Sequence, residues 1–306
     1  MKTNVFSAIA ALLSIPLLSL SLSLSAQNAG PQTDSTGYPG DGFSLEAAVE
    51  LFKKAQSPEE FEKLLNTEDN SINNLDLNDD GEIDYIRVID NMDGDVHAVV
   101  LQVPVSETES QDIAVIEIEK TGEEEATLQI IGDEDVYGKQ VIVEPFEEEK
   151  TRDGRNGPSL GDQPVRIVVN VWLWPSVRFV YRPGYVVWVS PWRWRLYPAW
   201  WRPWRPHPWG WYYVRVRPYY ARCHVVTVHR VTRAHAVYAP RRTHSTVVHT
   251  RTVTHGPRGG TKTKTTTTVR GKNGNVKAQR STTTRTGPHG HVKQQKTTTK
   301  VRRGRN

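Results

Sequence analysis

The stretch YIRVIDNMDGDVHAVVLQVPVSETESQDIAVIEIEKTGEEEATLQII, residues 85–131, decides the fold because apolar residues recur along much of it at every second position. This period is typical of β-strands that turn one face towards a core. The Asp-Gly pair at 93–94, between two such runs, predicts a tight hairpin. Before this stretch, Ser44 and Ser57 are helix-start signals followed by apolar residues at helical spacing. Residues 43–146 are therefore predicted to form an α+β domain, a helical hairpin packed on an antiparallel sheet of about five strands.

Charge is divided between the two halves of the chain. All 34 Asp and Glu residues lie at or before Asp162, whereas 29 of the 39 Lys and Arg residues and nine of the ten His residues lie after it. The net charge of +5 therefore conceals an acidic first half of about −25 and a basic second half of +29. Such a basic half favours anionic partners. It could equally neutralise the acidic half, within one chain or between chains.

Composition also marks the segments around the α+β domain. Residues 1–26 have the apolar centre and small-residue end of a secretory signal peptide, so we expect an exported protein. Residues 27–42 and 147–163 are predicted to be linkers. Cys223 is the only cysteine, which excludes an internal disulfide. It could pair between chains, be buried, or remain a free thiol.

Residues 164–222 are rich in Trp, Arg and Pro. Prolines at this density exclude a continuous helix or a central strand and predict an extended or turn-rich, β-like ribbon. Two interpretations are open. Indoles suit a membrane–water interface and Arg pairs with phosphate or carboxylate, so the segment could bind an anionic surface; alternatively, Arg and Trp could stack against the acidic domain and only stabilise it. The candidate contact residues are Trp192, Arg193, Trp194, Arg195, Trp200, Trp201, Arg202, Trp204, Arg205, Trp209 and Trp211.

Residues 223–306 form a basic tail rich in His and Thr, with internal repeats. His224, His229 and His235 recur twenty residues later, and Thr266–Ser281 is similar to Thr282–Thr297. These segments have β-like composition but few apolar side chains, so we expect a flexible, solvated tail. The repeated histidines could bind Zn²⁺, Ni²⁺ or Cu²⁺, although no closely spaced ligand pair occurs among them.

The loop DLNDDGEID at 76–84 has the spacing of a calcium-binding loop. Oxygen ligands stand at its first, third and fifth positions, a Gly at the sixth and an Asp at the ninth. The candidate ligands are Asp76, Asn78, Asp80, Glu82 through its carbonyl, and Asp84. Arg87 occupies the twelfth position, where an EF-hand has Glu, so the pattern predicts a shorter loop that leads into a strand. The alternative is a turn without metal.

Signatures of catalysis are absent from the sequence. No H-E-x-x-H, G-x-x-x-x-G-K-[ST] or G-x-G-x-x-G pattern occurs. The single G-x-S-x-G match, GPSLG at 157–161, lies in the predicted linker, without the strand and helix that this motif joins. The 75–88 stretch LDLNDDGEIDYIRV, the 112–120 stretch DIAVIEIEK, the Trp-Trp-Arg-Pro-Trp-Arg-Pro run and the Thr/Lys/Arg tail resemble a group of predicted secreted proteins of Bacteroidota-type Gram-negative bacteria that have no assigned activity. The resemblance implies location and architecture only.

The sequence therefore predicts a non-catalytic exported protein of the periplasm, the outer membrane surface or the extracellular space. Its basic aromatic half would bind anionic envelope polymers or lipid headgroups peripherally, without spanning the membrane. Cytoplasmic nucleic acid is not an expected partner, because the leader directs the chain out of the cytoplasm. The alternative is a structural or assembly protein that associates through its acidic and basic halves, and an enzyme is the least favoured class.

Overall fold

The structure is a computed structural model that describes residues 35–36, 38–148, 166–255, 260–270, 276–288 and 291–301. The predicted signal peptide (1–26) and most of the two predicted linkers (27–42 and 147–163) lie outside these ranges. Helices and antiparallel sheets are mixed in the described residues, so the protein belongs to the predicted α+β class. No helix in the described part of the chain has the length and apolar character needed to cross a membrane.

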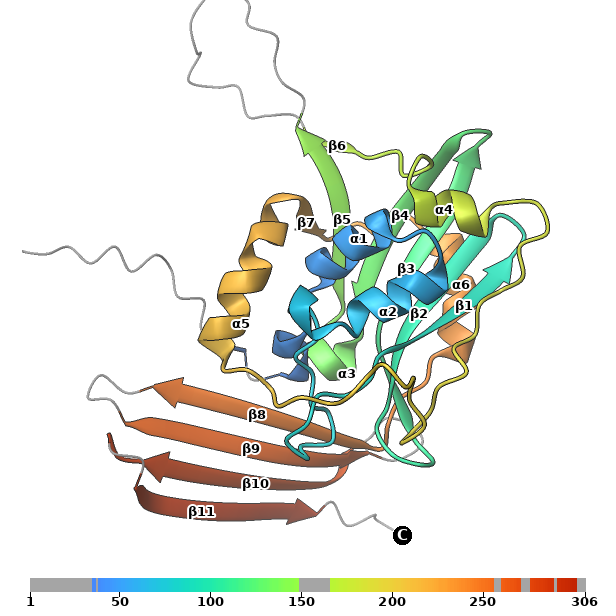
Figure 1. Ribbon diagram of the computed structural model, residues 1–306. Coiled ribbons are helices and arrows are strands. Elements are labelled where there is room, and N and C mark those ends of the chain that lie inside the picture. Colours follow the sequence, from blue (N-terminus) through green and yellow to red (C-terminus); the bar gives the residue numbers. More distant parts are fainter. Residues whose placement is uncertain are drawn as a thin grey trace, which may run out of the picture. The chain divides into compact units, whose positions relative to one another are not determined.

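A seven-stranded antiparallel sheet forms the centre of the α+β part (Figure 1). Its strands are β1 (Arg87–Asp93), β2 (Val96–Pro104), β3 (Ser110–Gly122), β4 (Glu125–Gly132), β5 (Val141–Glu148), β6 (Arg166–Val168) and β7 (Cys223–Val226). The order is β1-β2-β3-β4-β5-β6, and β7 also pairs with β5. Gly94 has a φ of 57° in the predicted hairpin between β1 and β2, a conformation that glycine adopts without steric cost. The sequence predicted about five strands, and β6 and β7 come from the basic half.

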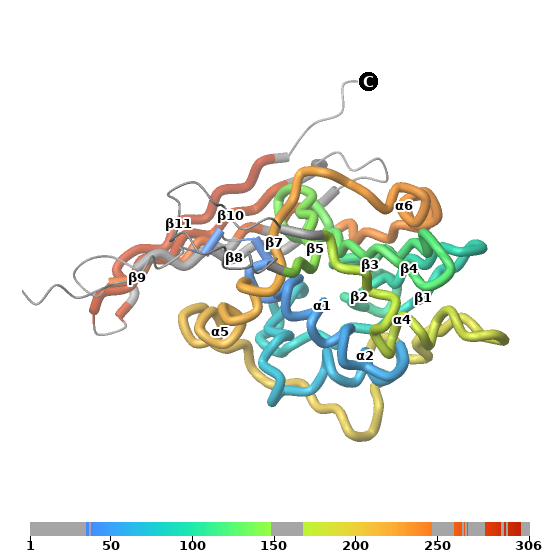
Figure 2. The backbone as a smooth tube through the Cα atoms, turned by 90° about the horizontal axis from the view of Figure 1, so that it is seen from above, coloured from blue at the N-terminus to red at the C-terminus, as the bar shows by residue number. Residues whose placement is uncertain are grey.

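Two helices cover one face of this sheet, and a third covers the other (Figures 1 and 2). The first two are α1 (Leu45–Lys54) and α2 (Pro58–Leu65), and the third is α6 (Thr232–Tyr238). The Oγ of Ser44 and that of Ser57 each accept a backbone N–H at 3.2 Å, so both predicted caps are present. Phe52 and Phe61 meet edge to face in the core under α1 and α2. The remaining short helices before residue 170 are η1 (Pro39–Gly42), η2 (Glu68–Asn70) and α3 (Glu134–Tyr137).

The Trp/Arg/Pro-rich segment, 164–222, is not a continuous β-like ribbon. It contains α4 (Pro175–Val180), α5 (Trp209–Val216) and η3 (Arg217–Ala221). Pro175 is the first residue of α4, a position where the missing N–H costs nothing, and Trp209–Val216 has no proline at all. Between α4 and α5, where prolines are dense, the chain makes only isolated bridges. The prediction of an extended or turn-rich ribbon was therefore wrong at α4, where Pro175 begins a helix, and at α5, where prolines are absent, and it agrees with the chain between these two helices.

Residues 223–306 are more structured than the prediction of a flexible tail. After β7, α6 and η4 (Ala239–Arg241), an antiparallel sheet follows with the order β11-β10-β9-β8. Its strands are β8 (Val247–His255), β9 (Thr261–Arg270), β10 (Val276–Thr286) and β11 (Val292–Val301). β-branched threonine favours extended backbone, and threonine hydroxyls pair across strands, as between Thr282 and Thr297. Cross-strand pairing thus replaces the apolar core whose absence led to the prediction of flexibility.

Candidate functional site

The segment at residues 222–246, here called the covering segment, lies over acidic side chains of the first half. Eight of the nine ion pairs among the described residues join it to a carboxylate of the first half. The basic partners are Arg222, His224, His229, Arg230, His235 and Arg242. The acidic partners are Glu50, Glu117, Asp133, Glu134, Asp135 and Glu144. Basic side chains of the covering segment therefore compensate the negative charges of carboxylates in the same chain.

Arg242 makes the most extensive of these contacts. Its guanidinium donates from Nε to Oδ2 of Asp133 at 2.6 Å and from Nη2 to Oδ1 of the same residue at 3.0 Å. This fork-to-fork geometry is the strongest form of an Arg–carboxylate pair. Nη2 also donates to Asp135 at 3.1 Å. The Asp133 side chain is almost fully buried, so water cannot solvate its carboxylate. The positive charge of Arg242 compensates the negative charge of this carboxylate instead.

Asp112 is a second buried carboxyl beneath the covering segment. It accepts hydrogen bonds from Gln102 Nε2 at 2.7 Å, from the backbone N–H of Thr243 at 2.8 Å and from the Tyr238 hydroxyl at 3.2 Å. Burial nevertheless raises the pKa of Asp112 to about 6. The hydrogen bonds compensate only part of the desolvation of its ionised form.

The four-stranded sheet β8–β11, here called the Thr/Lys sheet, carries cations of a different kind. Lys262 is directly opposite Arg285, and Thr283 has Lys264 opposite it on one side and Lys296 on the other. Directly opposite residues of antiparallel strands project from the same face, so these four cations share a face. All four are exposed. Within the described ranges, no ion pair joins a Lys or Arg of this sheet to an acidic residue.

The eleven predicted contact residues of the Trp/Arg run divide by side-chain type. The arginines Arg193, Arg195, Arg202 and Arg205 are exposed. Of the tryptophans, Trp200 is exposed, Trp201 is buried, and Trp192, Trp194, Trp204, Trp209 and Trp211 are half-buried. Backbone contacts anchor the run: the carbonyl of Trp204 accepts the N–H of Ile83 at 2.7 Å, and that of Trp192 accepts Arg87 Nη1 at 3.0 Å. The arrangement is closer to the second interpretation, in which the Trp and Arg residues pack against the acidic domain, than to an aromatic surface exposed to a partner.

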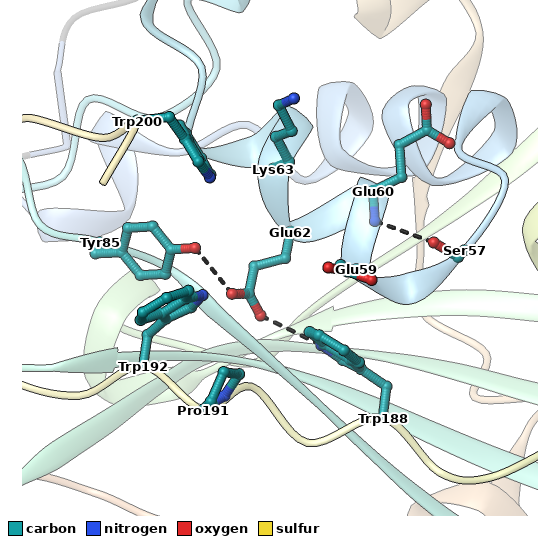
Figure 3. Close-up of a pocket in the computed structure, with 10 residues that line it drawn as sticks. All are labelled: Ser57, Glu59, Glu60, Glu62, Lys63, Tyr85, Trp188, Pro191, Trp192 and Trp200. Atoms are coloured by element: carbon teal, nitrogen blue, oxygen red, sulfur yellow. Dashed lines mark hydrogen bonds between the residues drawn. The ribbon is translucent and has the colours of Figure 1, made fainter. Parts of the chain in front are cut away.

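A hollow of about 370 Å³ lies where this run meets α2 (Figure 3). Its lining residues are Ser57, Glu59, Glu60, Glu62, Lys63, Tyr85, Trp188, Pro191, Trp192 and Trp200. Glu62 is buried and accepts four hydrogen bonds, among them the Tyr85 hydroxyl at 2.8 Å and the Ser190 hydroxyl at 2.9 Å. Burial raises the pKa of Glu62, and these donors oppose the shift. Its carboxyl is fully engaged in holding the aromatic run and is not presented to a ligand.

The five candidate calcium ligands lie in a loop that is closed by its own hydrogen bonds. The carboxylate of Asp76 accepts the backbone N–H groups of Asp80 at 3.1 Å and of Gly81 at 2.9 Å. Asp84 turns inward and accepts the N–H of Leu77 at 2.6 Å. Asn78 and Asp80 bond to each other, and Glu82 is exposed and donates its N–H to Asp80. This pattern is that of an Asx-rich turn.

The buried, closely spaced carboxyl groups of this loop would be stabilised in their ionised form by a bound cation. Burial first, and then the charges of Asp76 and Asp80, raise the pKa of Asp84 well above its usual range. Calcium binding by these residues stays a prediction. A higher thermal midpoint in Ca²⁺ than in chelator would support it.

Several polar residues of the central sheet were missed as functional candidates. Glu117 and Glu119 alternate with isoleucines in β3, as do Gln129 in β4 and Glu144 in β5 with their apolar neighbours, which is the pattern of a sheet with one solvated face. All four are buried because the covering segment lies over them. The only signal for this in the sequence is the charge division itself. Of the repeated histidines, His229 and His235 converge on Glu117, which the spacing alone did not predict.

Cys223 lies in β7 and is buried, with a free thiol. Burial raises its pKa to about 12, so the reactive thiolate is scarce at neutral pH. No protein-family model matches the chain, and the searches of curated proteins and of solved structures found no similar protein. The site must therefore be interpreted from its own chemistry.

Proposed function

We propose that this protein is a non-catalytic, exported binding protein of the cell envelope that holds an anionic polymer on the cationic face of its Thr/Lys sheet. The supporting observation is the register that brings Lys262, Lys264, Arg285 and Lys296 onto one exposed face. Like charges directly opposite in a sheet repel each other, and a bound polyanion would relieve this repulsion. The face also carries threonine hydroxyls, which can bond to the oxygens of a sulfated, phosphorylated or carboxylated polymer.

A polymer fits this face better than a bilayer does. Among residues with described side chains, Thr, Ser, Gln, Lys and Arg dominate the sheet, and the sequence of its four strands contains no Trp, Tyr or Phe. Binding to a membrane interface favours Trp and Tyr, and most tryptophans of this protein are at least half-buried elsewhere. We therefore assign the sheet to a hydrated polyanion, with attraction that is screened by salt.

The test is binding of the full chain to a soluble acidic polysaccharide and to anionic vesicles at rising salt. We expect polymer binding at low salt that weakens as salt increases. The triple variant Lys262→Glu, Lys264→Glu, Lys296→Glu should bind at least tenfold more weakly. The matched control, Arg193→Glu, Arg202→Glu, Arg205→Glu, changes the net charge equally on the Trp/Arg run and should bind within about threefold of the wild type.

Two results would refute this proposal. Equal losses in both triple variants would indicate that total charge, not the sheet, controls binding. Tight binding to vesicles that only the Trp/Arg variant abolishes would assign membrane attachment to the aromatic run.

The alternative is an assembly of several chains through their oppositely charged halves. The ion pairs support pairing of the two halves within one chain better than pairing between chains. Six basic residues of the covering segment already pair with carboxylates of their own chain. An assembly built on these same groups would have to exchange them between chains. A molecular mass in solution that rose with protein concentration and fell with salt would favour this alternative.

A further inference from the structure

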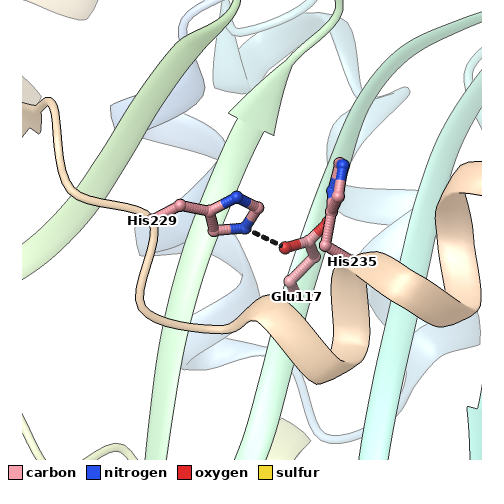
Figure 4. Close-up of side chains that lie close together, drawn as sticks. All are labelled: Glu117, His229 and His235. Carbon is pink, nitrogen blue, oxygen red and sulfur yellow. Dashed lines mark hydrogen bonds and ion pairs between the residues drawn. The ribbon is translucent and has the colours of Figure 1, made fainter.

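Glu117, His229 and His235 bring three metal-ligating side chains together outside the Thr/Lys sheet (Figure 4). Glu117 projects from β3, His229 from the loop after β7, and His235 from α6. The His229 Nε2 is 2.6 Å from one oxygen of Glu117, and the His235 Nδ1 is 2.7 Å from the other. The two imidazole rings face each other edge to face, with centroids 4.8 Å apart. One carboxyl is thus shared by two imidazoles.

Buried side chains of the sheet hold both histidine-bearing segments in place. Glu119 Oε1 accepts the backbone N–H groups of Arg233 at 2.7 Å and of Ala234 at 3.1 Å, which fixes the first turn of α6. Gln129 accepts the N–H of Arg230 at 2.8 Å and donates to the carbonyl of Val228 at 2.9 Å. These bonds fix the backbone on both sides of His229. Ligands preorganised by such supporting bonds are characteristic of metal sites.

We propose that Glu117, His229 and His235 bind a divalent first-row transition metal ion, with Zn²⁺ the best match to the ligands. Two imidazoles and one carboxylate form a recurrent three-ligand set for Zn²⁺ in proteins. The three ligand atoms lie within 4.8 Å of one another. A tetrahedral ion with bonds of about 2.0–2.1 Å separates its ligands by about 3.3 Å, so each short His–Glu contact would open by less than about 1 Å.

The surroundings of the three residues favour a cation. The Glu117 side chain has no solvent exposure, and among the described residues its only ion-pair partners are the two histidines. The side chains of His229 and His235 are 20% and 33% exposed. The ion can therefore enter from the side of the covering segment and complete its coordination with water.

The proposed site would act as a cross-link and is independent of the polyanion face. It joins the centre of the acidic sheet to the loop and helix that cover it. Bound metal should raise the thermal midpoint of the full chain, because the ligands come together only in the folded state. The proposal predicts a stabilising effect and requires no catalytic one.

The test is titration of the chelator-treated full chain with Zn²⁺, followed by calorimetry and by thermal unfolding. We expect one site per chain whose affinity falls at least tenfold in Glu117→Gln and in His235→Asn. The matched controls are His224→Asn, which removes a partly exposed histidine of the same segment, and the double variant His289→Asn, His291→Asn in the tail. Both controls should keep the site.

A spectroscopic measurement keeps the proposal testable if a variant does not fold. Co²⁺ bound to the wild type should show the visible absorption of a four-coordinate site with nitrogen and oxygen ligands, and Zn²⁺ should displace it. Absence of uptake by the wild type, or equal uptake by the Glu117 variant and the His224 control, would overturn the assignment.

Discussion

The covering segment and the Thr/Lys sheet have similar composition and opposite surroundings. Both lie in the half of the chain that has no acidic residue, and both are rich in basic residues, Thr and Val. In the covering segment, six basic side chains contact carboxylates of the first half. In the sheet, the four cations of the shared face have one another, threonines and Gln294 as cross-strand neighbours, and no carboxylate among them. Composition alone therefore does not distinguish cations that stabilise the fold from cations that are free to bind a partner.

The largest expected effect concerns Arg242 of the covering segment. The substitution Arg242→Ala would leave Asp133 buried without its bidentate partner. Removing one member of a buried pair costs 3–5 kcal/mol, and partial exposure of the guanidinium lowers the expected loss to about 3 kcal/mol of unfolding free energy. Urea denaturation measures this loss.

The control is Arg233→Ala, which removes an exposed arginine of the same segment and should change the free energy of unfolding by less than about 0.5 kcal/mol. Equal effects in both variants would contradict the distinction between paired and free cations.

The second effect is a pH dependence that originates at Asp112. Its folded-state pKa of about 6 lies above its value in the unfolded chain, so the folded state binds the proton more tightly. The stability that protonation contributes is complete below the unfolded pKa and is lost as the pH rises through about 6. Between about pH 4.5 and 6.5, the wild type should lose about 2 kcal/mol relative to Asp112→Asn.

Unfolding curves of the two proteins at matched pH values measure this difference. The Asp112→Asn protein is the control, since it keeps the shape of the side chain and removes its titrating group. A difference in unfolding free energy that stayed constant across the pH range would contradict the raised pKa.

Local signals in the sequence predicted the local parts of the fold. Ser44 and Ser57 marked helix starts because capping depends on residues within one turn, and the Asp-Gly pair marked the β1–β2 hairpin for the same reason. The alternation in β3 correctly placed Ile116 and Ile118 in the core. These features require no knowledge of distant residues.

The site required contacts between residues far apart in the chain. Glu117 is 112 positions from His229 and 118 from His235, and its alternation with isoleucine predicts a solvated face equally well. The charge division allowed pairing between the halves but could not identify the partners. The Thr/Lys sheet was missed because the expectation was based on apolar core, whereas hydroxyl pairs and strand register organise this sheet.

The smallest expected effect is a gain in stability, opposite in sign to the loss expected for Arg242→Ala. Lys262→Thr removes the like charge opposite Arg285 without changing the β-propensity unfavourably. Cross-strand repulsion is worth a few tenths of a kcal/mol, so the variant should stabilise the pairing of β9 with β10 by about 0.3–0.5 kcal/mol at low salt. Hydrogen exchange of the amides in these two strands measures the change.

Lys300→Thr is the matched control because Gln279, a neutral residue, is opposite Lys300. Since high salt screens the repulsion, the gain of the Lys262 variant should disappear there. A gain that persisted in high salt would come from threonine's preference for strands, and the charges of this face would then not repel one another.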